Sequence, residues 1–288
     1  MSTRPIARRT RTPVAGRRAR QVKRASAGLS PVRAGAALAM LVSAAAVYGV
    51  GASSAFDYAK VSIDGVRFTD RAVVEATIAD ARGENLFQLS TGPLEATLET
   101  LPTIQTARID VRLPDTLAVT IEERRPVLIW QVGASRYLAD GDGRLFAALA
   151  KVTPADAAGL PVIDDRRGSA GGLSVGERLD AVDLDAATRL ASLVPGDVGS
   201  SAVALAVVVT DENGFVVTTR PGTWSAVFGF YTPSLRTTEL IPGQVRLLRS
   251  LLIGREPLVE RVILASESDG TYVPRPTPSA TPKPKAAP

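Results

Sequence analysis

Few residues in this sequence have the type and spacing that catalysis requires. The chain of 288 residues contains neither cysteine nor histidine. Disulfides, thiolate or imidazole metal ligands and histidine-activated nucleophiles are therefore excluded. Lys60 and Lys151 are the lysines between residues 57 and 273, and neither stands in an S-x-x-K pattern. No phosphate loop or dinucleotide fingerprint is present either. We expect no catalytic residue and no cofactor-binding residue.

Acidic residues offer two further candidates for a site. The sequence "DGDG" at residues 140–143 resembles the start of a calcium loop, but the twelfth position is Lys151 instead of a bidentate glutamate. A hairpin turn explains these glycines better. Glu122 and Glu123 are neighbours in an expected strand, so their side chains point to opposite faces. We expect them to form surface ion pairs with the two arginines that follow. The sequence thus predicts no metal site and no small-molecule ligand, and it favours a protein that is not an enzyme.

The N-terminal region predicts a membrane protein. Residues 1–33 carry ten Lys or Arg and no Asp or Glu, although the whole chain has a formal net charge of only +5. This basic segment lacks apolar periodicity and is expected to be a disordered tail. Residues 34–56 contain no charge and are long enough to cross a bilayer as a helix.

An uncleaved signal anchor is the favoured interpretation of residues 34–56, and a cleaved signal peptide is the alternative, because Ser53 and Ala55 are small. Positive charge holds the N-terminal side in the cytoplasm. The expected topology is therefore single-pass type II, with residues from 57 onward outside the cytoplasm. Membrane orientation accounts for the arginines, and we expect no nucleic-acid partner.

Residues 57–124 predict a small domain with the order β-α-α-β-β. A strand around Val61 and Ile63 is followed by two segments with apolar residues at helical spacing, in residues 69–83 and 91–102. The ribbon "LPTIQTARIDVRLPDTLAVTIEERRPV" (residues 101–127) then alternates, turns at Pro114-Asp115 and alternates again. Such a hairpin has one solvent-exposed face and one face that packs against the helices.

Residues 125–273 predict a second domain built mainly from strands. The run "VALAVVVTDENGFVVTT" contains a strong hairpin signal at Asp211–Gly214, and residues 184–194 and 243–252 have helical spacing. Residues 274–288 hold six prolines and form an expected disordered, proline-rich tail. The predicted fold class is α+β: one transmembrane helix, the β-α-α-β-β domain and a mixed, mainly β-sheet domain.

The order of these elements resembles the FtsQ/DivIB family of bacterial division proteins, which combine a POTRA domain (polypeptide-transport-associated) with a β domain. The segments "VSIDGVRF", "GENLFQL", "LPTIQTARIDVRLPDTLAVTIEERRPV" and "LADGDGRLF" carry this resemblance. The arginine-rich, lysine-poor usage is typical of a GC-rich, actinobacterial source. The usual family pattern has a lysine soon after a glycine near the last helix; Gly229 fits, but no lysine follows.

The resemblance implies a non-enzymatic scaffold at the division septum. It would dock the membrane proteins FtsB and FtsL and help to control septal peptidoglycan synthesis by other enzymes. Two alternatives remain from the residues: a POTRA-bearing component of polypeptide transport or envelope assembly, and a secreted protein released by signal cleavage.

The run "LVERVILAS" is the candidate partner-binding segment. It contains apolar residues at both parities, and an exposed edge strand offers unpaired backbone groups to an incoming strand. An ordinary buried strand is the alternative interpretation. The resemblance implies that the last strands receive FtsB, and the residues predicted to form this edge strand are Val259, Glu260, Arg261, Val262, Ile263, Leu264 and Ala265.

Overall fold

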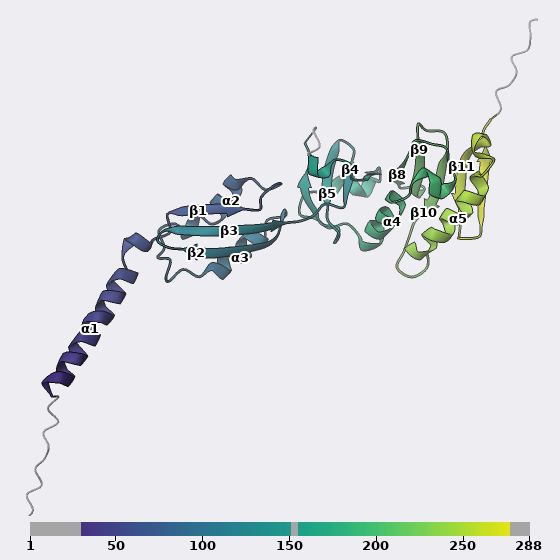
Figure 1. The fold of residues 1–288 in the computed structure, drawn as a ribbon. Coiled ribbons are helices and arrows are strands. Elements are labelled where there is room, and N and C mark those ends of the chain that lie inside the picture. The colour runs from purple at the N-terminus through teal and green to yellow at the C-terminus, as the bar shows by residue number, and fades with distance from the viewer. Residues whose placement is uncertain (1–29, 151–154, 277–288) are drawn as a thin grey trace, which may run out of the picture. The chain divides into compact units, whose positions relative to one another are not determined.

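The computed structural model describes residues 30–150 and 155–276 (Figure 1). Most of the two predicted tails, in 1–29 and 277–288, lies outside these residues. Helix α1 (Pro31–Gly51) is one unit by itself, and residues from Ser53 onward form a second unit. The predicted α+β fold class is confirmed, with an apolar N-terminal helix, a β-α-α-β-β domain and a mainly β region.

Helix α1 is the one helix among the described residues that is long and apolar enough to span a membrane. Its 21 residues correspond to about 32 Å at the usual helical rise. It begins three residues earlier than the predicted span, because the Ser30 side chain accepts the Arg33 N–H at 3.4 Å and Pro31 occupies the first turn. None of its residues is buried.

The β-α-α-β-β domain forms a three-stranded sheet with the order β1-β3-β2. Strand β1 is parallel to β3, and β2 is antiparallel to β3. Helices and strands pack around a core that includes Ile63, Leu98 and Val119. The elements in chain order are β1 (Lys60–Asp64), α2 (Arg71–Thr77), α3 (Thr91–Glu99), β2 (Ile104–Arg112) and β3 (Thr116–Glu123).

The predicted hairpin at residues 101–127 is present, although its inward face is shorter than the alternation indicates. Ala107 and Ile109 are buried, but Val111 and Leu113 are exposed by 38% and 54%. The core therefore ends before the tip of the hairpin.

The remaining strands form one nine-stranded mixed sheet with the order β12-β11-β10-β9-β8-β7-β4-β5-β6. The pairs β4/β7, β7/β8 and β10/β11 are parallel, and the other pairs are antiparallel. The strands are β4 (Leu128–Val132), β5 (Ser135–Ala139), β6 (Leu145–Ala148), β7 (Val162–Asp165), β8 (Ala204–Thr210), β9 (Gly214–Arg220), β10 (Ser225–Gly229), β11 (Val259–Leu264) and β12 (Gly270–Pro274).

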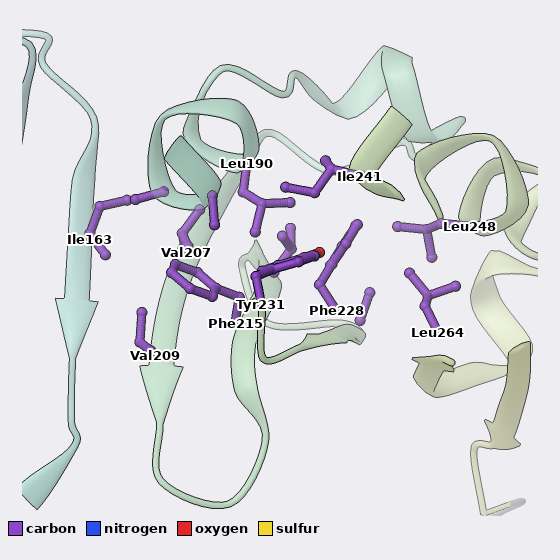
Figure 2. Close-up of a cluster of buried hydrophobic side chains, with 14 of the residues drawn as sticks. Ile163, Leu190, Val207, Val209, Phe215, Phe228, Tyr231, Ile241, Leu248 and Leu264 are labelled. Atoms are coloured by element: carbon purple, nitrogen blue, oxygen red, sulfur yellow. The ribbon is translucent and has the colours of Figure 1, made fainter. Parts of the chain in front are cut away.

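Two helices supply the core on one side of this sheet. Helix α4 (Ala181–Ala191) contributes Leu190, and α5 (Ile241–Leu252) contributes Ile241 and Leu248. Figure 2 shows these side chains pointing toward Phe215 of β9 and Phe228 of β10. Helix α4 begins earlier than the predicted helix at 184–194, because the Asp180 carboxylate accepts the Val182 N–H at 2.8 Å and caps the first turn.

The junction after β3 differs from the expected surface ion pairs. Glu122 forms a long, exposed ion pair with Arg125 at 4.0 Å and accepts the Thr106 hydroxyl at 3.4 Å. Glu123 is buried, and its carboxylate accepts backbone N–H groups of Arg67 (2.8 Å), Phe68 (2.9 Å) and Thr69 (2.7 Å). A backbone segment that is distant in sequence supplies these donors, so the sequence did not reveal them.

Arg124 is also largely withdrawn from solvent, with 14% of its side chain exposed. Its guanidinium donates to the Asp140 carboxylate at 2.8 Å, and its Nε donates to the carbonyl oxygen of Pro102 at 3.1 Å. Asp140 also accepts the backbone N–H groups of Asp142 and Arg144 at 3.0 and 2.8 Å. These bonds form the turn between β5 and β6, which is the hairpin turn expected at residues 140–143.

Replacing Glu123 with alanine should destabilise the β-α-α-β-β domain by about 1.5–3 kcal/mol, because three backbone donors lose a charged acceptor. Denaturant unfolding of the purified full chain in detergent, with amide exchange at Arg67–Thr69, measures this effect. The exposed neighbour provides the matched control, since Glu122→Ala should leave both quantities within error. Equal effects of the two substitutions would contradict the role of Glu123.

Candidate functional site

The segment predicted to bind a partner does not lie at the sheet edge. Val259–Leu264 is strand β11, which pairs with β10 on one side and with β12 on the other. Ala265 follows the strand and donates its N–H to the Asp269 carbonyl oxygen at 2.9 Å. The designation of residues 259–265 as the edge strand was therefore wrong. The turn at residues 266–269 reverses the chain, so that β12 covers the edge of β11.

The exposure of β11 differs between its two faces. Val259, Val262 and Leu264 are buried against the main core. Glu260 is exposed, and Ile263 is 39% exposed. A register shift between Val259 and Arg261 interrupts the alternation, so that Val259 is buried together with Val262 and Leu264, whereas Ile263 lies on the partly open face.

Strand β12 is the outermost strand at this end of the sheet. Its residues Thr271–Pro274 are exposed, including 41% of both Tyr272 and Val273. In an antiparallel ladder, successive residues face the partner strand and the outside in turn. The bonds from Ala265 to Asp269 and from the Arg275 N–H to the Leu258 carbonyl place odd-numbered residues against β11. Gly270 and Tyr272 therefore direct their backbone groups outward.

The opposite end of the same sheet is covered at Leu145. Strand β6 is outermost there, but Leu145 donates its N–H to the Glu177 carbonyl at 2.8 Å. The Leu145 carbonyl in turn accepts the Gly176 N–H at 2.7 Å. The two ends of the nine-stranded sheet therefore differ, and β12 offers the open edge.

A buried polar network fixes the strand next to this edge. The Arg236 guanidinium donates to the carbonyl oxygens of Phe228 (2.7 Å) and Leu264 (2.8 Å), and also to that of Ala265. Gln244, which is fully buried, donates to the same Phe228 and Leu264 carbonyls at 3.3 and 3.2 Å. Because these carbonyls end the parallel strands β10 and β11, the network joins both strands to α5.

Sequence reasoning missed Arg236. An arginine seven residues after Gly229 was the available signal. Gly229 has a φ of +87°, and a Cβ there would lie 3.2 Å from the Arg236 guanidinium. The glycine therefore provides both the left-handed conformation and the space for the arginine.

The turn between β11 and β12 packs directly against the start of α5. A Cβ added to Gly243 would lie 2.3 Å from the Glu267 Cβ, which is closer than two carbon atoms can approach. Glycine at this position thus permits the contact that holds the turn, and with it β12, against the helix.

Glu256 anchors the other end of β11. Its carboxylate accepts the Trp224 Nε1–H at 2.9 Å, the Ser201 N–H at 2.9 Å and the Ser201 and Ser200 hydroxyls. Partial burial raises the pKa of Glu256, but the hydrogen bonds from Ser200, Ser201 and Trp224 outweigh it and lower the pKa to about 2. The carboxylate is therefore ionised and fully engaged in structure.

The polar groups that this end of the sheet presents to solvent are the backbone groups of β12. Among residues 30–150 and 155–276, no group of three or more Asp or Glu side chains is placed to hold a metal ion. An exposed strand edge can instead bind an extended segment by backbone hydrogen bonds. A hollow of about 410 Å³ next to Arg275, lined partly by Val203, Pro221 and Pro257, adds apolar surface nearby.

Comparison with known proteins agrees with this architecture. Residues 56–124 match the POTRA domain, FtsQ-type. The chain is 30% identical over 172 residues to the cell division protein FtsQ of Chloroflexus aurantiacus. These matched residues cover 60% of this chain and 61% of that protein. It is 30% identical over 118 residues to FtsQ of Myxococcus fulvus, covering 40% of each chain, and 31% identical over 106 residues to FtsQ of Streptomyces griseus, covering 36% and 49%.

These matches confirm the family resemblance inferred from the sequence, including the POTRA domain. The chain spans about three fifths or less of the length of the curated relatives it matches. Together with α1, the similarity supports a single-pass membrane protein.

Protonation of Glu256 should weaken the fold in acid. A folded-state pKa near 2, below the ordinary 4.5, means that the carboxylate stabilises the fold above about pH 4.5 and loses this contribution as pH falls toward 2. Glu256→Gln should therefore be less stable near neutral pH and should lose less stability over this window. Unfolding midpoints between pH 7 and pH 2 measure both effects.

A matched substitution separates this effect from general acid sensitivity. Glu212 lies exposed in the β8–β9 turn, and Glu212→Gln should retain the pH profile of the unaltered chain. If Glu256→Gln also retained that profile, the carboxylate of Glu256 would not be the group that titrates.

Proposed function

We propose that this chain, whose POTRA domain is of the FtsQ type, is a cell division protein that acts at the septum as a membrane-anchored scaffold. The proposal rests on its similarity to proteins named FtsQ, on the apolar helix α1 and on the open strand edge of the β region. In this role the chain binds other proteins and performs no chemistry. It helps to control septal peptidoglycan synthesis by enzymes that it assembles.

The domain organisation follows from this proposal. Residues 1–33 are the cytoplasmic tail, 34–56 the span, 57–124 the POTRA domain, 125–273 the β domain and 274–288 the proline-rich tail. The basic charge of the first segment supports a type II topology, with both folded domains outside the cytoplasm.

The partners in this proposal are membrane proteins resembling FtsB and FtsL. The observation that carries the binding mode is the outward-facing backbone of Gly270 and Tyr272 on β12. An extended segment of the FtsB-like partner pairs with β12, so that the sheet gains a tenth strand. Residues 259–265 lie one strand inward and contribute the exposed surface of Glu260 and Ile263.

Tyr272→Pro should reduce capture of the FtsB-like partner by about tenfold, which corresponds to one lost hydrogen bond. The substitution removes an outward N–H donor and no bond to β11, and proline is tolerated at such positions of edge strands. Co-purification from membranes that contain full-length chains measures capture. Tyr272→Ala is the matched control, because it removes the side chain and retains the N–H; it should capture the partner better than Tyr272→Pro.

The same variants test the division role in cells. A tagged chain should form a midcell band, and its depletion should give filamentous or branched cells. Tyr272→Ala should restore division better than Tyr272→Pro. Uniform envelope signal with normal division after depletion would overturn the division role, whereas equal capture by Tyr272→Pro and the unaltered chain would overturn only the docking edge.

The absence of cysteine permits a direct test of topology. Leu235 is 92% exposed, so Leu235→Cys should react with a membrane-impermeant maleimide in intact spheroplasts. A cysteine at Ser2 should react only after the membrane is permeabilised. The reverse pattern of labelling would refute the type II orientation.

A further inference from the structure

The POTRA sheet has an edge whose outward donors are already occupied. Strand β2 pairs with β3 and lies at the end of the order β1-β3-β2. Half of the backbone groups of such a strand face away from the sheet. In β2 these include the N–H groups of Ala107 and Ile109, which donate to side chains of α3 instead of to another strand.

Two glutamates of α3 accept these bonds. Glu95 Oε1 lies 2.7 Å from the Ile109 nitrogen, and Glu99 Oε1 lies 3.1 Å from the Ala107 nitrogen. Both bonds are partly buried, and α3 packs against β2. Neither glutamate forms an ion pair within 4.0 Å among the described residues.

The spacing of the two carboxylates matches that of a strand. Residues four apart on a helix rise by about 6 Å, and residues two apart on a strand rise by about 6.6 Å. Glu95 meets the later residue of β2 and Glu99 the earlier one, so the two elements run in opposite directions. The carboxylates therefore occupy positions where an added antiparallel strand would place carbonyl oxygens.

The sequence of β2 also indicates which strand would fit at this edge. Arg108 and Asp110 flank Ile109 on the solvent face, and Arg108 Nε lies 3.5 Å from Asp110 Oδ1. If two copies of β2 paired antiparallel with Ile109 at the centre, Arg108 of each copy would stand opposite Asp110 of the other. Opposite charges across a strand pair are favourable. A shift of the register by two residues in either direction would instead place Arg108 opposite Arg108 or Asp110 opposite Asp110, which is unfavourable. The edge is thus complementary to a second copy of itself.

We propose that the β2 edge is a latent pairing surface for a second copy of this chain and that Glu95 and Glu99 hold it closed. By acting as a substitute strand, the two carboxylates keep the POTRA sheet at three strands and leave strand addition to other edges. This inference concerns the POTRA domain alone and is independent of the proposed division role and of the β12 edge.

The double substitution Glu95→Ala/Glu99→Ala tests the proposal in the full chain purified in detergent. Amide exchange at Ala107 and Ile109 should accelerate about tenfold or more at low protein concentration, because both donors lose their acceptors. Light scattering corrected for detergent should show a dimer at concentrations where the unaltered chain is monomeric. At these concentrations the two amides should regain protection as the second copy pairs.

Two matched variants separate the proposal from effects of charge. Glu95→Gln/Glu99→Gln retains an acceptor oxygen at each position and should remain monomeric and protected. Glu75→Ala/Asp80→Ala removes the same charge from exposed positions of the same domain and should also remain monomeric. If Glu95→Ala/Glu99→Ala exchanged rapidly but stayed monomeric, the carboxylates would be simple caps and the latent pairing surface would be refuted. Unchanged exchange at both amides would refute the closure itself.

Discussion

A strand at the end of a sheet leaves half of its backbone N–H and C=O groups without a strand partner, and this constraint governs the surfaces of the chain. At β6 the segment that contains Gly176 and Glu177 supplies partners for the backbone groups of Leu145. At β2, two carboxylates of α3 accept the outward N–H groups. Strand β12 alone among these three remains exposed along its length. The contrast between closed and open edges is the strongest structural reason to assign partner binding to β12.

An open edge is useful for recognition only if its position is defined, because a mobile strand would lose more entropy on binding. Arg236 and Gln244 bind the carbonyls at the ends of β10 and β11, and the turn before β12 packs on Gly243. Glu256 anchors the start of β11 through Trp224 and two serines. The residues that prepare the edge therefore lie outside it, on α5 and on connecting loops.

Much of the fold was predictable from the sequence because the signals are local. Alternation and the Pro114-Asp115 turn predicted the β2–β3 hairpin, and Asp211–Gly214 predicted the β8–β9 hairpin. The candidate site was only partly predictable. Residues 259–265 form the strand next to the outermost strand β12, because a period-two pattern describes a central strand and an edge strand equally well. Which strand is outermost depends on where β12 pairs, and that pairing is tertiary.

The sequence alone determined the order of elements, the apolar N-terminal helix and the lack of cysteine and histidine chemistry, because these depend on residue type and on spacing between near neighbours. Only the tertiary structure decided that Glu123 is buried, that Arg124 pairs with Asp140, that Arg236 binds two strand ends and that Glu95 and Glu99 accept the outward N–H groups of β2. Each of these contacts joins a side chain to backbone groups or to a charge on another element. Backbone groups have no sequence signature, so only the folded chain brings such donors and acceptors together.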